Sequence, residues 1–362
     1  MIDFRYHVVS IIAVFLALSV GLVLGASFLK EAAVSGLDTQ VQDLARNNEG
    51  LRRELDRANA GQKYLNGVMS TVGPELVDNR LTGHKAVVVA LPGADTKLVD
   101  NMVKLLDSAD ATVTGQVAIK NSWTDPGHEG DLLAALGTSG AATTTGTPTE
   151  RAAKVLADAI TQKAPTGPGT GTTPPSTPTT SPPATTTPGG GTASSSPPSG
   201  GASQPPTGQS GANTTPTHDT TAAVATLTRF KDGGFIDVKD NPAAGADLVV
   251  VVAPSGAVGG DDPGRVNNIH LSLARTLDGE DGGTVMAGTA SAAQDNGTIW
   301  ALRRNDQTAK AVSTVDTADT PVGQVAVVWA LVVEDEEGSS GQYGTTGTTD
   351  GPLPELPKKE TS

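Results

Sequence analysis

The chain begins with a long apolar stretch that contains almost no polar positions. From Val8 to Leu29 there are 22 consecutive residues without a charged side chain. A helix of that length is roughly 33 Å long, enough to cross a hydrocarbon core of about 30 Å. A cleaved signal peptide would have a shorter apolar region and an A-x-A-like exit, which Gly25-Ala26-Ser27-Phe28 does not provide. The pattern predicts an uncleaved single-pass anchor over residues 1–30, in contact with membrane lipid.

Small residues recur every four positions within this stretch, at Ala13, Ala17, Gly21 and Gly25. This spacing places them on one helix face, where two membrane helices can approach backbone to backbone. The same spacing also arises by composition alone in an apolar segment. Self-association through this face and a chance pattern therefore remain alternatives.

The charges that flank the stretch set its expected orientation. Arg5 precedes it, whereas Lys30 after it is offset by Glu31. Cytoplasmic flanks of membrane helices carry an excess of Lys and Arg. We therefore expect a cell-membrane protein with its N-terminus in the cytoplasm and its bulk outside.

A heptad pattern follows over residues 31–73, unbroken for 36 residues or about 54 Å of helix. Its a positions are Val41, Asn48, Leu55, Gln62 and Met69, and its d positions are Leu37, Leu44, Leu51, Ala58, Leu65 and Val72. A buried Asn at an a position fixes register and favours two parallel strands. The pattern predicts a coiled coil in a parallel dimer or a higher homo-oligomer, with Leu44, Asn48, Leu51 and Leu55 at its centre. The alternative is a single amphipathic helix that lies on its own globular domain.

After Gly73-Pro74 the period changes to short apolar runs that alternate with amphipathic stretches. Val-rich strands in this alternation are typical of a parallel sheet covered on both faces. Strands are predicted at 85–91, 111–119, 247–253, 284–288 and 311–315. Helices are predicted at 94–106, 150–162 with Thr149 as N-cap, 222–230, 265–277, 292–303, and from Pro321 to about 333 with Thr320 as N-cap. The fold class is α/β, a Rossmann-like, mostly parallel sheet built from residues 82–163 and 218–335.

The two parts are separated by residues 164–217, which contain no charged or aromatic side chain and 13 of the chain's 24 prolines. Such a segment cannot bury enough apolar surface to offset its ordering entropy. We expect a disordered Pro/Thr/Ser/Gly-rich linker inserted into one domain, because neither part alone has enough strands for a covered sheet. Residues 338–362 are expected to form a mobile tail.

Composition and motifs exclude several kinds of functional site. The 362 residues include no cysteine, which excludes thiolate metal sites and Cys nucleophiles. The net charge of −14 argues against nucleic-acid binding, because an acidic surface repels phosphate backbones. The turn Leu91-Pro92-Gly93-Ala94-Asp95 lacks the dinucleotide fingerprint, and no other catalytic motif is present. No catalytic or cofactor-binding residue is identified, and we expect no enzyme.

Metal-ligand candidates are equally sparse. The five histidines are dispersed, at His7, His84, His128, His218 and His270. Copper(I) prefers Cys or Met, but the methionines form no cluster and Met69, Met102 and Met286 fit core positions. Asp316 and Asp319 follow a strand where open α/β sheets place ligands, although a capping or turn role is the simpler interpretation. The metal-binding residues remain unknown.

Several blocks of the sequence resemble the MctB family, which is named for a mycobacterial copper transport protein. They are Phe4–Ser10 (FRYHVVS), Ala13–Leu18 with Gly21 and Leu24-Gly25, Val87–Val89, Gly234–Ile236, Ser313–Asp316, Gly323-Gln324 and Gly341–Gly344 (GQYG). The resemblance covers most of residues 1–344 except the linker. It implies a membrane protein of copper transport or homeostasis, with copper as the transported ion and a channel formed by several chains. Some relatives resemble envelope partners whose coiled coil engages another protein, which gives a non-enzymatic scaffold as the alternative.

Overall fold

A computed structural model describes residues 4–137, 145–161, 219–279 and 282–357; the side chains of residues 4–5 and 26–39 are also outside this description. The chain divides into two compact units, Met1–Gly73 and Pro74–Ser362. The linker expected at 164–217 lies outside the described residues. The prediction of a disordered insertion therefore stays a prediction.

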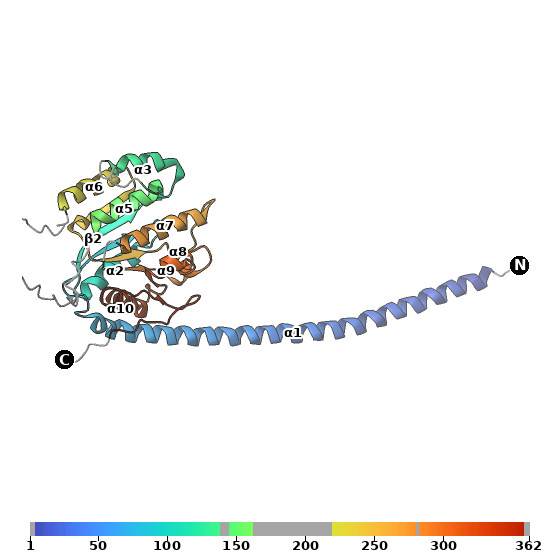
Figure 1. Ribbon diagram of the computed structural model, residues 1–362. Helices are drawn as coiled ribbons and strands as arrows, with labels where there is room; N and C mark the ends of the chain where they lie inside the picture. Colours follow the sequence, from blue (N-terminus) through green and yellow to red (C-terminus); the bar gives the residue numbers. More distant parts are fainter. Residues whose placement is uncertain (1–3, 138–144, 162–218, 280–281, 358–362) are drawn as a thin grey trace, which may run out of the picture. The chain divides into compact units, whose positions relative to one another are not determined.

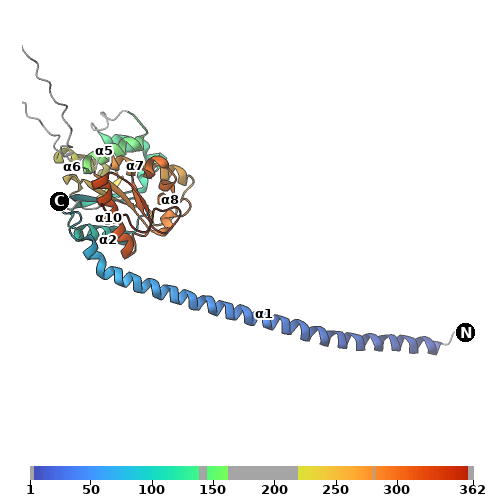
Figure 2. The same ribbon diagram turned by 60° about the horizontal axis from the view of Figure 1, so that its bottom comes forward.

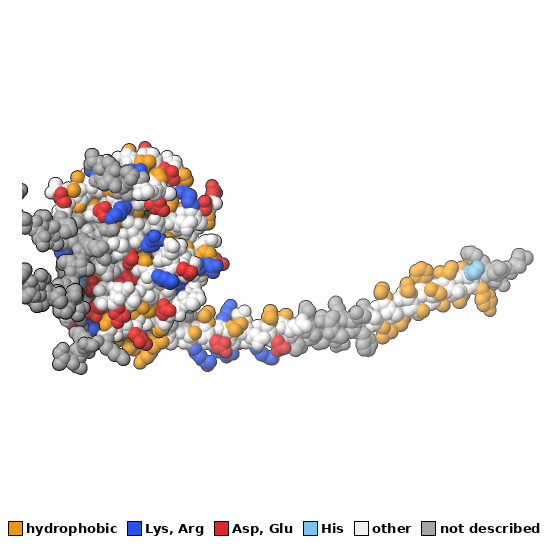
Figure 3. All heavy atoms as spheres, in the orientation of Figure 1, with side chains coloured by type: hydrophobic (Ala, Val, Ile, Leu, Met, Phe, Trp, Pro, Cys, Tyr) orange, Lys and Arg blue, Asp and Glu red, His pale blue; other side chains and the backbone are white. Residues whose placement is uncertain are grey.

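The first unit consists of helix α1 (Phe4–Val77), whose last turn from Pro74 belongs to the second unit. Within it, Tyr6–Gly25 is long and apolar enough to cross a membrane, with a mean hydropathy of 2.7 and no buried side chains. Hydrophobic side chains surround this part of α1, and charged and apolar side chains mix along its later part (Figure 3). The structure confirms one N-terminal apolar helix, which among the described residues is the one candidate span.

The second unit contains one seven-stranded sheet in the order β3-β2-β1-β4-β5-β6-β7. The strands are β1 (Lys85–Ala90), β2 (Thr112–Ile119), β3 (Ile236–Asp240), β4 (Leu248–Val252), β5 (Gly283–Ala287), β6 (Ser313–Val315) and β7 (Gln342–Tyr343). All neighbours are parallel except β2 and β3. Because β1 pairs with β4 along its length, the segments before and after the linker share one sheet. The prediction of a single, mostly parallel sheet is confirmed.

Helices cover both faces of this sheet (Figures 1 and 2). One face carries α2 (Thr96–Ser108) and α10 (Pro321–Glu337). The other carries α5 (Pro148–Ile160), α6 (Thr220–Asp232) and α7 (Pro263–Asp278), and α3 (Glu129–Leu136) packs against α5 and α6. The short helices α8 (Thr298–Arg303) and α9 (Asp306–Ala309) lie beside α7 and the end of the sheet. Every residue of β4 is buried, as expected for a Val-rich strand between two helical layers. Trp123 and Phe230 pack in the core with ring centroids 5.4 Å apart.

The observed start of α5 corrects one prediction. The N-cap is Thr147, not Thr149: its hydroxyl accepts from the amide of Glu150, and the Glu150 carboxylate accepts from the amide of Thr147. Pro148 takes the first helical position, where its missing N–H costs no hydrogen bond. The helix predicted at 292–303 is likewise divided into a 3₁₀ turn at Ala290–Ala293 and α8.

The tail expected to be mobile from residue 338 is folded as far as 357, and residues 358–362 lie outside the described residues. Its strand β7 pairs with β6. The amide of Gly341 donates to the hydroxyl of Ser313 at 3.0 Å, and the hydroxyl of Thr314 donates to Oε1 of Gln342 at 2.6 Å. Polar contacts of this kind, rather than an apolar pattern, order the segment, which explains why its Gly/Thr-rich sequence resembled a free tail.

Candidate functional site

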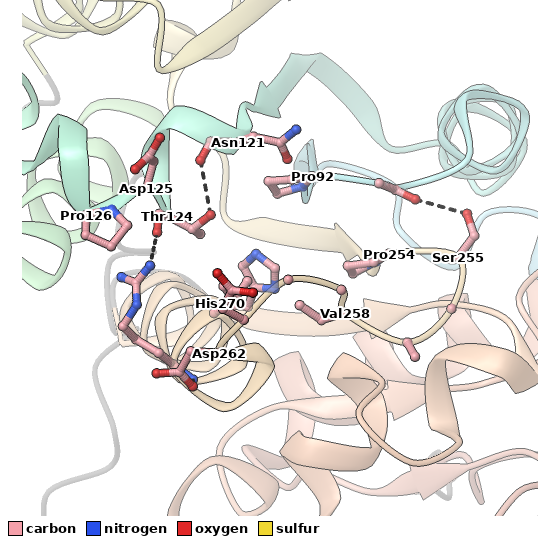
Figure 4. A pocket seen from close by; sticks show the side chains of 18 residues that line it. Pro92, Asn121, Thr124, Asp125, Pro126, Pro254, Ser255, Val258, Asp262 and His270 are labelled. Carbon is pink, nitrogen blue, oxygen red and sulfur yellow. Dashed lines mark hydrogen bonds between the residues drawn. The ribbon is translucent and has the colours of Figure 1, made fainter.

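The second unit has a pocket of about 660 Å³ where the strand order reverses between β1 and β4 (Figure 4). The loops after β1, β2 and β4 and the first turns of α7 enclose it. Ligands of open α/β sheets bind in such crevices outside the carboxyl ends of the strands. Its lining includes Gly93, Thr124, Asp125, Ser255, Asp261, Asp262, Arg265 and His270.

The walls of the pocket are held together by bonds between loops. Gly93, with φ +86°, ends the turn after β1, and its carbonyl accepts from both the amide and the hydroxyl of Ser255 at 3.0 and 3.1 Å. The carbonyl of Ser255 in turn accepts from the hydroxyl of Thr289 at 3.1 Å. Further along the loop, Gly256 and Gly260 have open space where a Cβ would lie. The pocket therefore combines hydrogen-bonded walls with an open, glycine-rich rim.

Acidic groups dominate the charge of the pocket. Asp125, Asp261 and Asp262 line it with a single arginine, Arg265. The guanidinium of Arg265 donates to the carbonyl of Thr124, and a carboxylate oxygen of Asp262 caps α7 by accepting from the amide of Arg265 at 2.9 Å. A hydrogen bond from the amide of Gly127, supported by His128, holds the pKa of Asp125 below its usual range. The glycine-rich loop and the helix start thus carry carboxylates where a phosphate would bind.

His270 is a buried histidine whose ring lines the pocket. Its Nδ1 lies 3.5 Å from the hydroxyl of Thr298, and that hydroxyl donates its proton to Oδ1 of Asn267 at 2.9 Å. The hydroxyl can therefore only accept from His270, which places the ring proton on Nδ1 and leaves Nε2 as an acceptor. Nε2 has no hydrogen-bond partner among the described residues. Burial lowers the pKa of His270 to about 4, so the ring is neutral at pH 7.

The other candidate copper ligands do not assemble. No group of three or more His, Cys, Asp or Glu among the described residues could hold a metal ion. His84 contacts Asp247 at 3.0 Å and Asp335 at 3.6 Å near the amino end of β1, and His128 contacts Asp125 at 3.1 Å. Met102 and Met286 are fully buried and fit the core positions assigned to them. His218 lies outside the described residues.

Asp316 has a structural role although it follows strand β6. It is fully buried and accepts from Nη1 of Arg303 at 2.9 Å and from the amides of Thr345 and Thr346 at 2.8 and 2.9 Å. The C-terminal segment therefore occupies the position after β6 at which open α/β sheets place ligands. Asp319 is exposed.

The predicted self-association residues all lie on α1. Ala13, Ala17 and Gly21 are exposed, and Gly25 is half-buried. Leu44, Leu51 and Leu55 are 73%, 67% and 61% exposed, and Asn48 is also exposed. The structure contains one chain, so pairing of these faces stays a prediction.

Sequence reasoning did not find the pocket or His270. The available signal was position: Pro92-Gly93 and Pro254-Ser255 each follow a central strand, and parallel strands end at the same edge of a sheet. His270 itself follows no motif, because Thr298, the partner of its Nδ1, lies on a different helix.

Comparison with known proteins agrees with the resemblance found in the sequence. The chain is 24% identical over 348 residues to the copper transporter MctB of Mycobacterium tuberculosis, which covers 95% of this chain and 96% of the relative. It is 26% identical over 350 residues to the copper transporter MctB of Mycobacterium leprae, with the same coverage. The model of the family described as copper transport outer membrane protein, MctB, matches residues 1–354. Because this match spans nearly the whole chain, the protein belongs to the MctB family.

Proposed function

We propose that this protein acts in copper transport and homeostasis as an oligomer of single-span subunits, with copper as the transported ion. The observation that carries the proposal is the family match over residues 1–354, together with relatives named copper transporters over 95% of the chain. The role is non-catalytic. Copper passes as cargo rather than as a resident cofactor.

An oligomer is needed because one helix cannot enclose a pore. The small-residue face of Ala13, Ala17, Gly21 and Gly25 supports close helix packing within a membrane. The exposed heptad side chains continue the same helix, and apolar a and d positions that face water are stabilised by burial against a second copy. Both features support a parallel homo-oligomer.

The copper role is tested by deleting the gene and measuring cell-associated copper and copper tolerance. We expect both quantities to change and to be restored by the wild-type gene. A matched control is a complementing chain truncated before residue 74, which keeps the anchor and heptad but lacks the α/β domain. Unchanged copper content and unchanged tolerance in the deletion strain would refute a copper role.

The oligomer is tested independently by single-cysteine crosslinking, since the chain has no native cysteine. Leu51→Cys at a d position brings two sulfur atoms within disulfide range in a parallel coil, whereas Arg53→Cys points outward. We expect disulfide-linked dimers of the full-length protein in membranes for L51C and about tenfold less for R53C. Equal crosslinking of the two variants would contradict a coiled coil in this register.

The second candidate is a non-enzymatic envelope scaffold in which the coiled coil and the α/β domain bind a partner protein. The observation that favours it is the set of exposed apolar heptad side chains on α1. A scaffold predicts a defect in envelope assembly on gene deletion with normal cell copper. The copper measurement above therefore separates the two functions.

The domain plan that goes with this proposal has an anchor at 1–30, a coiled coil at 31–73 and one Rossmann-like domain. The strand order 3-2-1-4-5-6 supports that assignment, because it is the order of doubly wound dinucleotide-binding folds, although β3 is antiparallel here. The domain is formed by residues 82–163 and 218–335, and we extend it to the strand at Gln342–Tyr343. The linker at 164–217 is an insertion. The anchor lies in the cell membrane with the α/β domain outside the cytoplasm.

A further inference from the structure

The pocket between β1 and β4 contains a polar group that the protein itself does not satisfy. Nε2 of His270 is buried without a hydrogen-bond partner, whereas Nδ1 contacts the hydroxyl of Thr298. An unpaired buried acceptor costs free energy, and a donor or a metal ion recovers it. Histidines that bind metals commonly donate their other ring N–H to an oxygen acceptor, as this ring does.

The charged side chains around the pocket favour a positively charged ligand. Three carboxylates, on Asp125, Asp261 and Asp262, line the pocket with one arginine. That arginine, Arg265, already donates to a backbone carbonyl, and the start of α7 is capped by Asp262. A phosphate or carboxylate ligand would meet these negative charges, whereas a cation is attracted by them.

Two hydroxyls of the pocket wall are already used as donors. The hydroxyls of Ser255 and Thr124 donate to the carbonyls of Gly93 and Asn121. In Figure 4 the ring of His270 rises from α7 between the loop that follows β2 and the loop that follows β4. A ligand that pairs with Nε2 of His270 needs to supply a donor or a positive charge.

We propose that this pocket binds a small cation, with Nε2 of His270 as its ligating or accepting atom and the pocket carboxylates as its counter-charges. Two sources share this chemistry: a copper ion that keeps water ligands, and an organic molecule with a protonated amine. The copper source rests on the proposed function, whereas the amine source does not. Nε2 is buried, so a bound cation supplies an interaction that water does not provide.

The test is calorimetric titration of the full-length protein in detergent with cupric chloride, spermidine and sodium phosphate. We expect one of the two cations to bind with a stoichiometry of one per chain and phosphate not to bind. His270→Phe keeps the buried volume and removes the acceptor, so it should weaken that site at least tenfold. Asp261→Asn leaves the buried core untouched and should weaken the same site about threefold by removing one charge.

His84→Ala is the matched control, since His84 is half-buried beside two carboxylates at the amino end of β1 and should leave the site unchanged. A copper site lost in H270F identifies the metal, and a spermidine site lost in H270F identifies an organic cation. The proposal is overturned if neither cation has a site that H270F weakens, or if phosphate binds and D261N strengthens it. Cell copper in the deletion strain is a separate measurement, so the pocket and the copper function can fail independently.

Discussion

At the scale of single residues, Asp316 connects the C-terminal segment to the end of strand β6 through two backbone amides. Its carboxylate is fully buried and accepts from Arg303 and from the amides of Thr345 and Thr346. Asp316→Asn keeps the size of the side chain, removes its charge and leaves Arg303 buried without a counter-ion. Removing one partner of such a pair costs about 3 kcal/mol. The loss is measured as the free energy of unfolding in urea, followed by tryptophan fluorescence.

All three tryptophans, Trp123, Trp300 and Trp329, lie in the second unit, so this signal reports on the α/β domain alone. Asp319→Asn is the control, because Asp319 is exposed and its replacement should change stability by less than about 0.5 kcal/mol. If the two variants lose equal stability, Asp316 does not hold the segment as described.

His270 gives the α/β domain a dependence on pH. Burial lowers its pKa from 6.5 to about 4, so between these values the unfolded chain binds a proton that the folded chain does not. Stability contributed by the neutral ring is fully present above pH 6.5 and decreases by about 3 kcal/mol as the pH falls to 4. His270→Phe cannot titrate and should lose about 3 kcal/mol less over this range. The measurement is urea unfolding at several pH values.

A second titrating group changes stability in the opposite direction. Burial raises the pKa of Asp278 to about 6, so the α/β domain loses stability through this group as the pH rises from 3.8 to 6. This contribution is common to the wild type and H270F and cancels in their difference. Parallel stability curves for the two proteins between pH 7 and pH 4 would show that His270 is not the group responsible.

At the scale of elements, the capping box of α5 anchors the helix that packs against both α6 and α7. Thr147→Ala removes the hydroxyl that accepts from the amide of Glu150 and should destabilise the domain by about 1 kcal/mol. Thr145→Ala, at an exposed position two residues earlier, is the matched control and should have no measurable effect. The midpoint of thermal unfolding distinguishes them; an unchanged midpoint in T147A would contradict the capping role.

Elements with an apolar pattern were predicted well, and elements ordered by polar contacts were not. The buried strand Leu248–Val252 was visible as a run of valines because it lies between two helical layers. The edge strands β3 and β7 gave no such signal, since Ile236–Asp240 alternates with charged residues and Gln342–Tyr343 is only two residues long. At the start of α5, two threonines flank Pro148, and only the three-dimensional contact to Glu150 distinguishes the cap.

The site was less predictable than the fold because its residues come from distant segments. His270 can be recognised as a site residue only from its three-dimensional contacts. Asn267 and Thr298 fix its tautomer, and the loops after β1 and β2 complete the pocket. Asp316 showed the converse: its position after a strand allowed a ligand role beside the simpler capping or turn role, and the fold uses it to bind its own C-terminal segment. Position in a sheet indicated where ligands bind but not which side chains are free to bind them.

At the scale of the whole molecule, the membrane orientation follows from very few charges and can be tested directly. Arg5 before the span Tyr6–Gly25 favours a cytoplasmic N-terminus, and in that orientation we expect the α/β domain outside. Because the chain has no cysteine, Ile2→Cys and Lys97→Cys each introduce a single thiol, the second at an exposed position of α2. In intact cells a membrane-impermeant maleimide should label K97C but not I2C, and permeabilised cells should label both. Labelling of I2C alone would reverse the orientation, and copper would then meet the α/β domain in the cytoplasm.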